Sequence, residues 1–410
     1  MLKSKIKDYF EVNREAIERD IVALTTEMCR ERTVNVTSDK LGEHPYLSAR
    51  GDEYRVADIV KRSLDEWHIP YQQFARIPER PNVVGTVGRG KSNAKLLVAA
   101  HMDVVPAGDG WTSDPWQVIV RNGNMIGRGV LDNKGPLASS LVAARVMKQV
   151  VGDDQLAGQF MISALSDEEA TDPDGVDYGI EFLLAEKHIQ PTCAIIPDIG
   201  ENMKRIDIAE KGRMVVKITS IGKQAHGSTP ERGVNAIYPM AALVSKFEKM
   251  RMNFAPHPLL VEPTMNLGEI HGGAAANIVA GECSIVLDIR TLPGQTREKV
   301  VAELQRVIDS VPGTFKIHID EWSDPHKIEP DNPLVKAIQQ NTQEFLGFTP
   351  ETFGMGGGTF AKTLVLNGIP AVGFGPGDDD AFHLADEYVE IKQLVDFAGL
   401  MCLVAVDLLA

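Results

Sequence analysis

Short apolar runs typical of buried strands alternate with helix-like segments through the first two hundred residues. The runs are nearly continuous in apolar side chains, which favours strands of a sheet covered on both faces. The helix-like segments repeat apolar residues every three or four positions, as Val56, Ile59 and Val60 do. The runs cover 83–84, 96–100, 159–164 and 194–196, and the helix-like segments cover 7–32, 51–68, 135–150 and 179–188. We therefore expect an α/β fold with a mixed, largely parallel sheet covered by helices.

Near Arg213 the order of the expected strands and helices changes. Strand, helix, strand, strand, helix and strand follow in that order, which is typical of a ferredoxin-like α+β domain. After a polar stretch, a helix and a last strand at 370–374 return to the first pattern. The expected elements of the second pattern cover 214–219, 235–250, 264–270, 281–290, 296–310 and 315–319, and the returning helix covers 333–346. We expect an inserted domain at 213–320 within a discontinuous domain formed by 1–212 and 321–410.

Composition argues against several partners. With 42 lysines and arginines against 57 aspartates and glutamates, the chain has a formal net charge of −15. Nucleic acids and anionic membranes bind basic faces, so neither is expected as the main partner. The N-terminal sequence lacks an apolar signal core, and the chain has no run of about 18 apolar residues. The sequence predicts a soluble, cytoplasmic protein whose four scattered cysteines are free thiols.

Histidines and carboxylates of the kind that bind metal ions stand where the apolar runs end. They lie beside glycines and prolines, so we expect them on tight loops that strands hold in place. Hard dications such as Zn²⁺ accept imidazole nitrogen and carboxylate oxygen, and a catalytic zinc keeps one position open for water. Any one such residue is more often a hydrogen-bonded core residue or a solvated acid than a ligand, but the whole set at strand ends favours a metal site. The predicted ligands are His101, Asp132, Glu169, Asp198 and His383.

The residues around these ligands suggest how a metal site would work. Asp103 lies two positions after His101, and residues two apart on a strand point the same way, so Asp103 can orient the far nitrogen of the His101 ring. Asp132, on a glycine-flanked loop, can bridge two ions about 3.5–4 Å apart. Glu168, next to a ligand and free to turn toward a water between the ions, is the expected general base.

At this point the chain resembles a known family. The runs HMDVVPAGDGW, GRGVLDNKG, SDEEA, AHGSTPERGVNAI, DIRTLPG and GGGT are similar to those of dinuclear zinc amidohydrolases and peptidases. That family includes carboxypeptidase G, acetylornithine deacetylase, succinyl-diaminopimelate desuccinylase, aminoacylase and the carnosinase-type dipeptidases. The resemblance implies two Zn²⁺ ions per subunit bridged by Asp132, with His101 and Asp198 completing one site and Glu169 and His383 completing the other. Co²⁺ or Mn²⁺ could substitute, because both accept these ligands.

The resemblance also implies roles for residues outside the ligand set. In relatives the inserted domain is a lid and the contact of a homodimer. His226 matches a histidine that crosses from the partner subunit to stabilise the tetrahedral oxyanion, while Asn277 and Arg290 match groups that bind the substrate's carbonyl and carboxylate. From the residues alone, His226 is as often a turn histidine, and Arg290 is more often a surface ion-pair residue. Gly356 and Gly357, before an expected helix, could present backbone N–H groups to an anionic substrate end, although a plain turn is nearly as common.

These patterns predict hydrolysis of an amide bond in a small substrate that bears a free carboxylate. An N-acyl amino acid is slightly favoured over a dipeptide, because the chain is shorter than the dipeptidases that it resembles. The run GGGTFAK, where many deacetylases carry GGTDAR, points toward the dipeptidases. A carboxypeptidase is a further alternative, and a metal-binding protein without catalysis is a remote one. A dipeptide's free amine would need an acidic partner, for which Asp378, Asp379 and Asp380 are available.

Two other patterns have simpler interpretations. Residues 85–92, GTVGRGKS, satisfy the phosphate-loop pattern GxxxxGK[ST], which requires a helix that begins at its lysine. The strand-like run at 96–100 follows instead, so we expect a turn between two strands. Asp172 and Asp174 lie in a Pro-Asp-Gly turn and are expected to be solvated acids rather than ligands.

Overall fold

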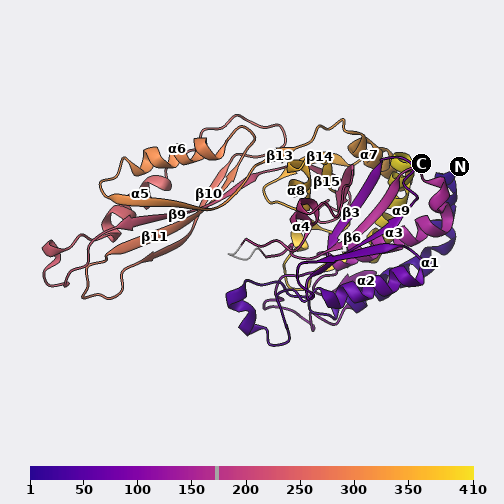
Figure 1. Ribbon diagram of the computed structural model, residues 1–410, viewed down its shortest axis with the longest axis horizontal. Coiled ribbons are helices and arrows are strands. Elements are labelled where there is room, and N and C mark those ends of the chain that lie inside the picture. Colours follow the sequence, from indigo (N-terminus) through magenta and orange to yellow (C-terminus); the bar gives the residue numbers. More distant parts are fainter. Residues whose placement is uncertain (171–174) are drawn as a thin grey trace. The chain divides into compact units, whose positions relative to one another are not determined.

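The computed structural model describes residues 1–170 and 175–410 and divides the chain into two compact units (Figure 1). The larger unit comprises Met1–Ile208, Ile328–Phe353 and Thr359–Ala410, and the smaller unit comprises Ala209–Lys327 and Gly354–Gly358. The second segment of the smaller unit, 354–358, was not expected from the sequence. Asp172 and Asp174, predicted in a turn, lie outside the described residues.

A nine-stranded mixed sheet forms the core of the larger unit, with strand order β1-β2-β6-β3-β7-β15-β8-β13 and β14 paired with β8. The four central strands β6, β3, β7 and β15 pair in parallel, and the outer pairs described are antiparallel. The strands are β1 (Tyr71–Ala75), β2 (Pro81–Val87), β3 (Lys95–His101), β6 (Gln159–Leu165), β7 (Cys193–Ile196), β8 (Arg205–Glu210), β13 (His326–Lys327), β14 (Glu351–Met355) and β15 (Ala371–Gly373). The predicted mixed, largely parallel sheet is thus confirmed.

Helices cover both faces of this sheet (Figure 1). On one face, α1 (Leu2–Cys29), α3 (Lys134–Val146) and α9 (Ile391–Leu409) pack on one another, and α3 and α9 contact β3 and β6. On the other face, Leu97 and Ala99 of β3 share an apolar cluster with Leu183 of α4 (Ile180–Ala185) and Leu364 of α8 (Phe360–Leu366). Two further helices, α2 (Tyr54–Glu66) and α7 (Pro333–Leu346), contact β2 and α9 respectively. No helix among the described residues has the length and apolar character needed to cross a membrane.

The smaller unit has the predicted β-α-β-β-α-β order. Its antiparallel sheet has strand order β10-β11-β9-β12. One face of the sheet buries an apolar cluster that includes Val216, Leu243, Ile285 and Leu304, so α5 and α6 pack on that face. The elements are β9 (Gly212–Ile221), α5 (Ile237–Phe247), β10 (Thr264–Gly272), β11 (Glu282–Thr291), α6 (Arg297–Ile308) and β12 (Thr314–Ser323). The ferredoxin-like arrangement is confirmed.

Three short strands form a second sheet in the larger unit that the sequence did not reveal. Its order is β16-β5-β4, with β4 (Ile119–Arg121), β5 (Asn124–Ile126) and β16 (Tyr388–Glu390). The expectation that the strand at 370–374 is the last one was therefore wrong. Strands of three residues are too short to display an alternating pattern. The phosphate-loop interpretation held, because β3 begins at Lys95 and no helix begins at Lys91.

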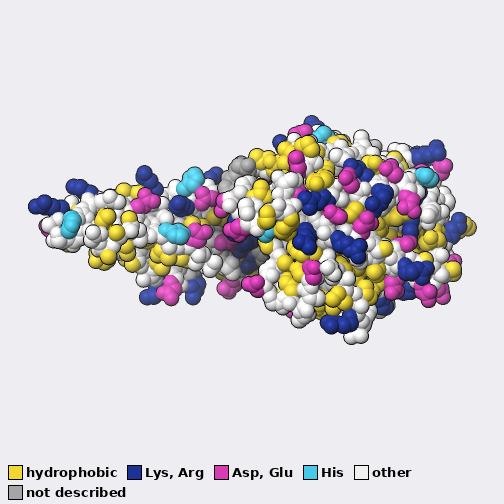
Figure 2. All heavy atoms as spheres, turned by 90° about the horizontal axis from the view of Figure 1, so that it is seen from below, with side chains coloured by type: hydrophobic (Ala, Val, Ile, Leu, Met, Phe, Trp, Pro, Cys, Tyr) yellow, Lys and Arg dark blue, Asp and Glu magenta, His cyan; other side chains and the backbone are white. Residues whose placement is uncertain are grey.

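Charged side chains of both signs are interspersed on the face shown in Figure 2, with basic and acidic groups as close neighbours over much of it. This mixture fits a chain in which acidic residues outnumber basic ones by 57 to 42.

Candidate metal centre

The predicted ligands gather at one edge of the larger sheet. His101 is the last residue of β3, Glu168 and Glu169 follow β6, and Asp198 follows β7. Because these three strands run parallel, their carboxyl ends share an edge and the loops that leave them converge. His101 also falls on the face of β3 that carries Leu97 and Ala99, since alternate residues of a strand point the same way.

Asp132, in the loop before α3, lies at the centre of the group. Its Oδ1 is 2.9 Å from Nε2 of His101, and that nitrogen is 3.5 Å from Oδ1 of Asp198. Its Oδ2 is 3.0 Å from Nε2 of His383, and that nitrogen is 3.1 Å from Oε2 of Glu169. The structure therefore brings the five predicted ligands together as two groups of three that share Asp132.

The donor atoms of both groups fit divalent cations. Each group offers one imidazole nitrogen and two carboxylate oxygens, a mixture that Zn²⁺ accepts. Two donors on one tetrahedral ion lie about 3.3 Å apart when each is about 2.0–2.1 Å from it. The separations of 2.9 to 3.5 Å are close to that value. The buried Oε1 of Glu169 has no hydrogen-bond partner among the described residues, as expected of an oxygen that a cation would bind.

The pKa values of the metal-free centre also indicate an excess of buried negative charge that bound cations would neutralise. Burial raises the pKa of Glu169 to about 8, and the negative charge of Asp132 adds to the shift. Hydrogen bonds to Asp132 and Glu169 raise the pKa of His383 to about 10. Burial alone would lower the pKa of His101, but its hydrogen bonds to aspartates outweigh burial and raise it. Protons thus offset an excess of buried negative charge, and bound cations would displace them.

Glu168 lies beside these groups. Its carboxylate is within 4.8 Å of the ligand atoms of His101 and Asp198. Burial raises the pKa of Glu168, and the negative charge of Asp198 raises it further. A carboxylate in this position can accept a proton from a water held at the centre. The same position would let Glu168 serve as a further ligand beside His101 and Asp198.

Asp103 contacts the ring of His101 and also holds a second loop. Nδ1 of His101 is 3.0 Å from the backbone carbonyl oxygen of Asp103 and 3.5 Å from its Oδ1, so the carbonyl is the closer acceptor. The Oδ2 atom of Asp103 accepts the backbone N–H groups of Glu168, at 3.0 Å, and of Glu169, at 2.9 Å. Asp103 therefore fixes the loop that carries the expected base, which its sequence spacing did not indicate.

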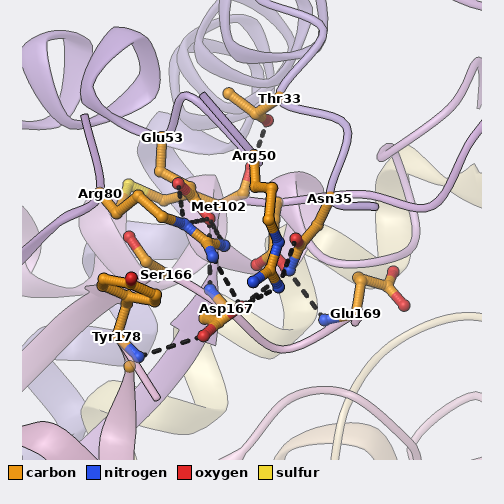
Figure 3. A network of polar contacts seen from close by, with 12 residues as sticks. Thr33, Asn35, Arg50, Glu53, Arg80, Met102, Ser166, Asp167, Glu169 and Tyr178 are labelled. Atoms are coloured by element: carbon orange, nitrogen blue, oxygen red, sulfur yellow. Dashed lines mark hydrogen bonds and ion pairs between the residues drawn. The ribbon is translucent and has the colours of Figure 1, made fainter. Parts of the chain in front are cut away.

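A polar network backs the same loop (Figure 3). Nδ2 of Asn35 donates to Oδ2 of Asp103, at 2.8 Å, and to Oδ1 of Asp167, at 3.1 Å. Asp167 also pairs with Arg80 at 2.8 Å, and the buried Arg80 is bound in turn to Glu53 through two nitrogens. Asp167 has φ 68, a left-handed conformation that costs a residue other than glycine about 1 kcal/mol or more. These contacts hold the loop in its shape, and nothing in the sequence pattern marked them.

The acidic run 378–380 supports the centre from another side. Oδ1 of Asp379 accepts the backbone N–H groups of Gly200, at 3.1 Å, and of Glu201, at 3.0 Å, just after Asp198. Asp378 accepts the hydroxyl of Tyr388 at 3.2 Å. Asp378 and Asp379 are therefore engaged in holding loops, and Asp380 is the exposed member of the run.

His226 and Asn277 lie on adjoining loops of the smaller unit. The backbone N–H of Gly227 donates to the carbonyl oxygen of Asn277 at 2.7 Å. Nδ1 of His226 accepts the backbone N–H of Ser228 at 3.1 Å. Because a backbone N–H can only donate, the neutral ring carries its proton on Nε2. The exposed His226 thus has an N–H donor available for an oxyanion.

Arg290 and the two glycines have other surroundings. Arg290 is near the end of β11, and its guanidinium binds both oxygens of Asp288, at 2.7 and 3.2 Å. In the structure it is thus an ion-pair residue. Gly356 and Gly357 lie between β14 and α8, and the side chain of Thr359 caps the first turn of α8.

Comparisons with known proteins agree with the geometry of the metal centre. Residues 97–407 match the model of peptidase family M20/M25/M40. The chain is 32% identical to an acetylornithine deacetylase of Pectobacterium carotovorum, over 80% of this chain and 83% of that protein. It is 28% identical to an uncharacterized metallohydrolase of Methanocaldococcus jannaschii, over 90% and 97% of the two chains. Among solved structures, aminopeptidase PepT from Bacillus cereus has a similar fold, with a TM-score of 0.73, 20% identity and coverage of 95% and 98%. The chain belongs to peptidase family M20/M25/M40 and is a metallohydrolase that acts on amide or peptide bonds.

Proposed function

We propose that this protein hydrolyses the amide bond of N-acyl amino acids, as a deacylase of the acetylornithine deacetylase and succinyl-diaminopimelate desuccinylase kind. The observation that carries the proposal is the sharing of Asp132 between two ligand groups, one with His101 and one with His383. The preference for an acyl substrate is supported by the relative that is 32% identical over 80% of this chain and bears the name acetylornithine deacetylase. Two Zn²⁺ ions per subunit are proposed, with Co²⁺ or Mn²⁺ as substitutes.

In the proposed reaction, Glu168, Asp103 and His226 have different roles. Two bound divalent cations would polarise the scissile carbonyl and acidify a water between them. Glu168 accepts a proton from the attacking water and returns it to the leaving amine nitrogen. Asp103 orients His101 and keeps the Glu168 loop in place. The Nε2–H of His226 donates to the oxyanion that develops on the substrate.

The positions of the substrate-binding residues favour a site made by two chains. Asn277 precedes the first residue of β11, Glu282, whereas Arg290 lies near its end. A strand rises about 3.3 Å per residue, so Glu282 and Arg290 are roughly 26 Å apart. A dipeptide-sized substrate is only about 7 Å long. Asn277 lies near the Glu282 end, because the adjacent Ile278 bridges His226 in the loop that follows Ile221, the residue paired with Glu282. A substrate of this length does not span from Arg290 to Asn277 of the same chain, so we propose a homodimer, formed through the smaller unit, in which His226 and Asn277 serve the partner's centre.

Mixing two inactive variants tests the crossed arrangement. Glu168→Gln removes the base, and His226→Ala removes the oxyanion donor. In a crossed heterodimer one centre receives an intact Glu168 from one chain and an intact His226 from the other. Co-refolding the two variants should therefore restore up to about a quarter of wild-type turnover, since half of the dimers are mixed and each has one intact centre. Activity that stays at the level of the separate variants would refute the crossed site.

Arg290, Asn277 and the two glycines would hold the substrate in place. Arg290 would bind the substrate's carboxylate by giving up part of its two-pronged contact with Asp288, because its planar fork suits either carboxylate. Asn277 would bind the substrate's carbonyl. The backbone N–H groups of Gly356 and Gly357 are proposed to bind its anionic end. Arg290→Lys keeps the charge and loses the fork, so it should raise KM more than it lowers kcat.

A dipeptidase or carboxypeptidase is the second function. One observation favours it: the run GGGTFAK places Phe360 where many deacetylases carry aspartate, and the Phe360 ring packs edge-on against His101 with centroids 6.5 Å apart. Phe360 belongs to the buried apolar cluster on that face of the sheet, so this position lacks the carboxylate that those deacetylases carry.

A matched substrate panel separates these functions. Metal-loaded protein is offered N-acetyl and N-succinyl amino acids beside dipeptides with the same C-terminal residues, and free amine is measured. Faster release from the acyl compounds supports the deacylase. Faster release from dipeptides overturns it in favour of the peptidase. No release of free amine from any compound of the panel, by protein that has two cations bound, would refute both substrate assignments.

A further inference from the structure

A buried ion pair outside the ligand set joins the loops of two ligands. Oε1 of Glu387 accepts the backbone N–H groups of Gly129, at 3.0 Å, Leu131, at 2.8 Å, and Asp132, at 3.1 Å. Its other oxygen, Oε2, accepts a hydrogen bond from Nη1 of Arg128. The Arg128 and Glu387 side chains are 1% and 0% exposed, so both charges depend on each other for neutralisation.

Arg128 extends this contact to His383. Its Nη2 donates to the backbone carbonyl oxygen of His383 at 3.2 Å and to that of Ala107 at 3.3 Å. Its guanidinium lies over the ring of Trp111, 5.3 Å from the centroid, which limits its freedom to move. The pair therefore touches the backbone of Asp132 at one end and the backbone of His383 at the other.

His383 is the ligand that most needs such support. Its side chain is 54% exposed, whereas that of His101 is 1% exposed. It has φ 63, a left-handed conformation that a residue other than glycine keeps only where its surroundings impose it. His101 instead ends a central strand, and Asp198 is held by Nδ2 of Asn133 at 2.9 Å. The two ligand groups are thus held by different means.

We propose that the Arg128–Glu387 pair is a positioning device for one of the two cation sites, the site formed by Asp132, Glu169 and His383. The inference rests on the proposed two-cation centre, and it assigns to the pair the task of fixing the distance between Asp132 and His383. Loss of the pair frees both of these ligands at this site. At the other site the effect is smaller, because His101 ends β3 and keeps its place, although Asp132 is shared and Asn133, which holds Asp198, follows it in the same loop.

Metal titration tests the proposal without reference to turnover. Glu387→Gln preserves the size of the side chain but leaves the charge of Arg128 without its partner. Metal-free protein is titrated with Co²⁺, and stoichiometry, affinity and the visible spectrum are recorded for each cation. Changes in residues that orient metal ligands lower metal affinity by about 10- to 100-fold. We expect that loss for the cation held by His383 and a smaller loss for the other cation, which shares Asp132.

The site that is weakened can be identified in a His383→Ala background. There Glu387→Gln should weaken the remaining cation by clearly less than it weakens the more affected cation in the chain that keeps His383, because only the shared Asp132 and its loop are disturbed. Arg128→Lys keeps the charge but cannot reach Glu387 and the His383 carbonyl at once, so it should give an intermediate loss. If circular dichroism shows that Glu387→Gln does not fold, the same Co²⁺ titration of Arg128→Lys tests whether one cation is weakened more than the other.

Arg145→Met is the matched control. Arg145 also pairs with a carboxylate, Asp20, at 2.7 Å, and stacks on a tryptophan, Trp67, at 5.1 Å, but it contacts no ligand loop among the interactions described. It should bind both cations as the wild type does. Equal weakening of both cations in Glu387→Gln, or of neither, would overturn the proposal. Failure of the wild type to bind a second cation would instead refute the two-cation centre itself.

Discussion

Replacing Glu168 with glutamine tests the proposed base most directly. Glutamine has nearly the same shape but cannot accept a proton from water at neutral pH. Glu168 is absent from the close contacts that join Asp132 to His101 and His383. Both ligand groups should therefore remain whole. We expect two cations per chain, turnover reduced strongly and KM changed little.

The size of the loss follows from the role assigned to the residue. A positioned general base contributes about 10²- to 10⁴-fold to the rate. At about 1.4 kcal/mol for each factor of ten, the variant should raise the barrier by about 3–5 kcal/mol. The assay measures kcat and KM on the best substrate of the panel, with metal content determined on the same sample. Glu181→Gln, which alters an exposed glutamate of α4, is the control and should behave as the wild type.

Two results would refute this reasoning. Turnover within about tenfold of the wild type would show that Glu168 is not the base. Loss of one cation would show that Glu168 is a ligand, a role that its distance of at most 4.8 Å from the ligand atoms of His101 and Asp198 allows.

Three further predictions follow from the same geometry. Cation binding must remove the proton of His383, whose pKa in the metal-free chain is about 10. The apparent affinity for the cation should therefore rise with pH between 6 and 9, by up to about tenfold per pH unit for each proton displaced. Isothermal titration at several pH values measures this, and an affinity that does not change with pH would contradict it. The raised pKa of His383 also makes the metal-free chain less stable as pH rises toward about 10, because it stabilises the folded state only while His383 stays protonated. Denaturant unfolding in the presence of a chelator at pH 7 and pH 9 measures the expected decrease in the free energy of unfolding. An increase between these pH values would contradict the prediction. Gly135→Ala would place a Cβ 2.0 Å from the carbonyl oxygen of Val130, so it should cost about 1–3 kcal/mol of unfolding free energy, whereas Gly42→Ala, with open space around it, should cost much less.

The amino-acid sequence determined the α/β alternation, the inserted β-α-β-β-α-β unit and the set of ligand-type residues. These features are local. Apolar periodicity reports strands and helices, and a histidine or carboxylate on a glycine-marked loop after a strand reports a site at the sheet edge. His101 and Asp198 were predictable because each stands within two residues of the end of a parallel strand.

Only the tertiary structure decided how those residues are held. Glu387 accepts the N–H of Asp132 from 255 positions away, and Asn35 reaches Asp103 across 68 positions. No periodicity links residues so far apart, and a buried glutamate or asparagine looks in the sequence like any surface polar residue. The assignment of each oxygen of Asp132 to a different histidine likewise depends on loops that meet only when the sheet has formed. Residue type and spacing therefore indicated the chemistry, while the packing of distant loops determined its geometry.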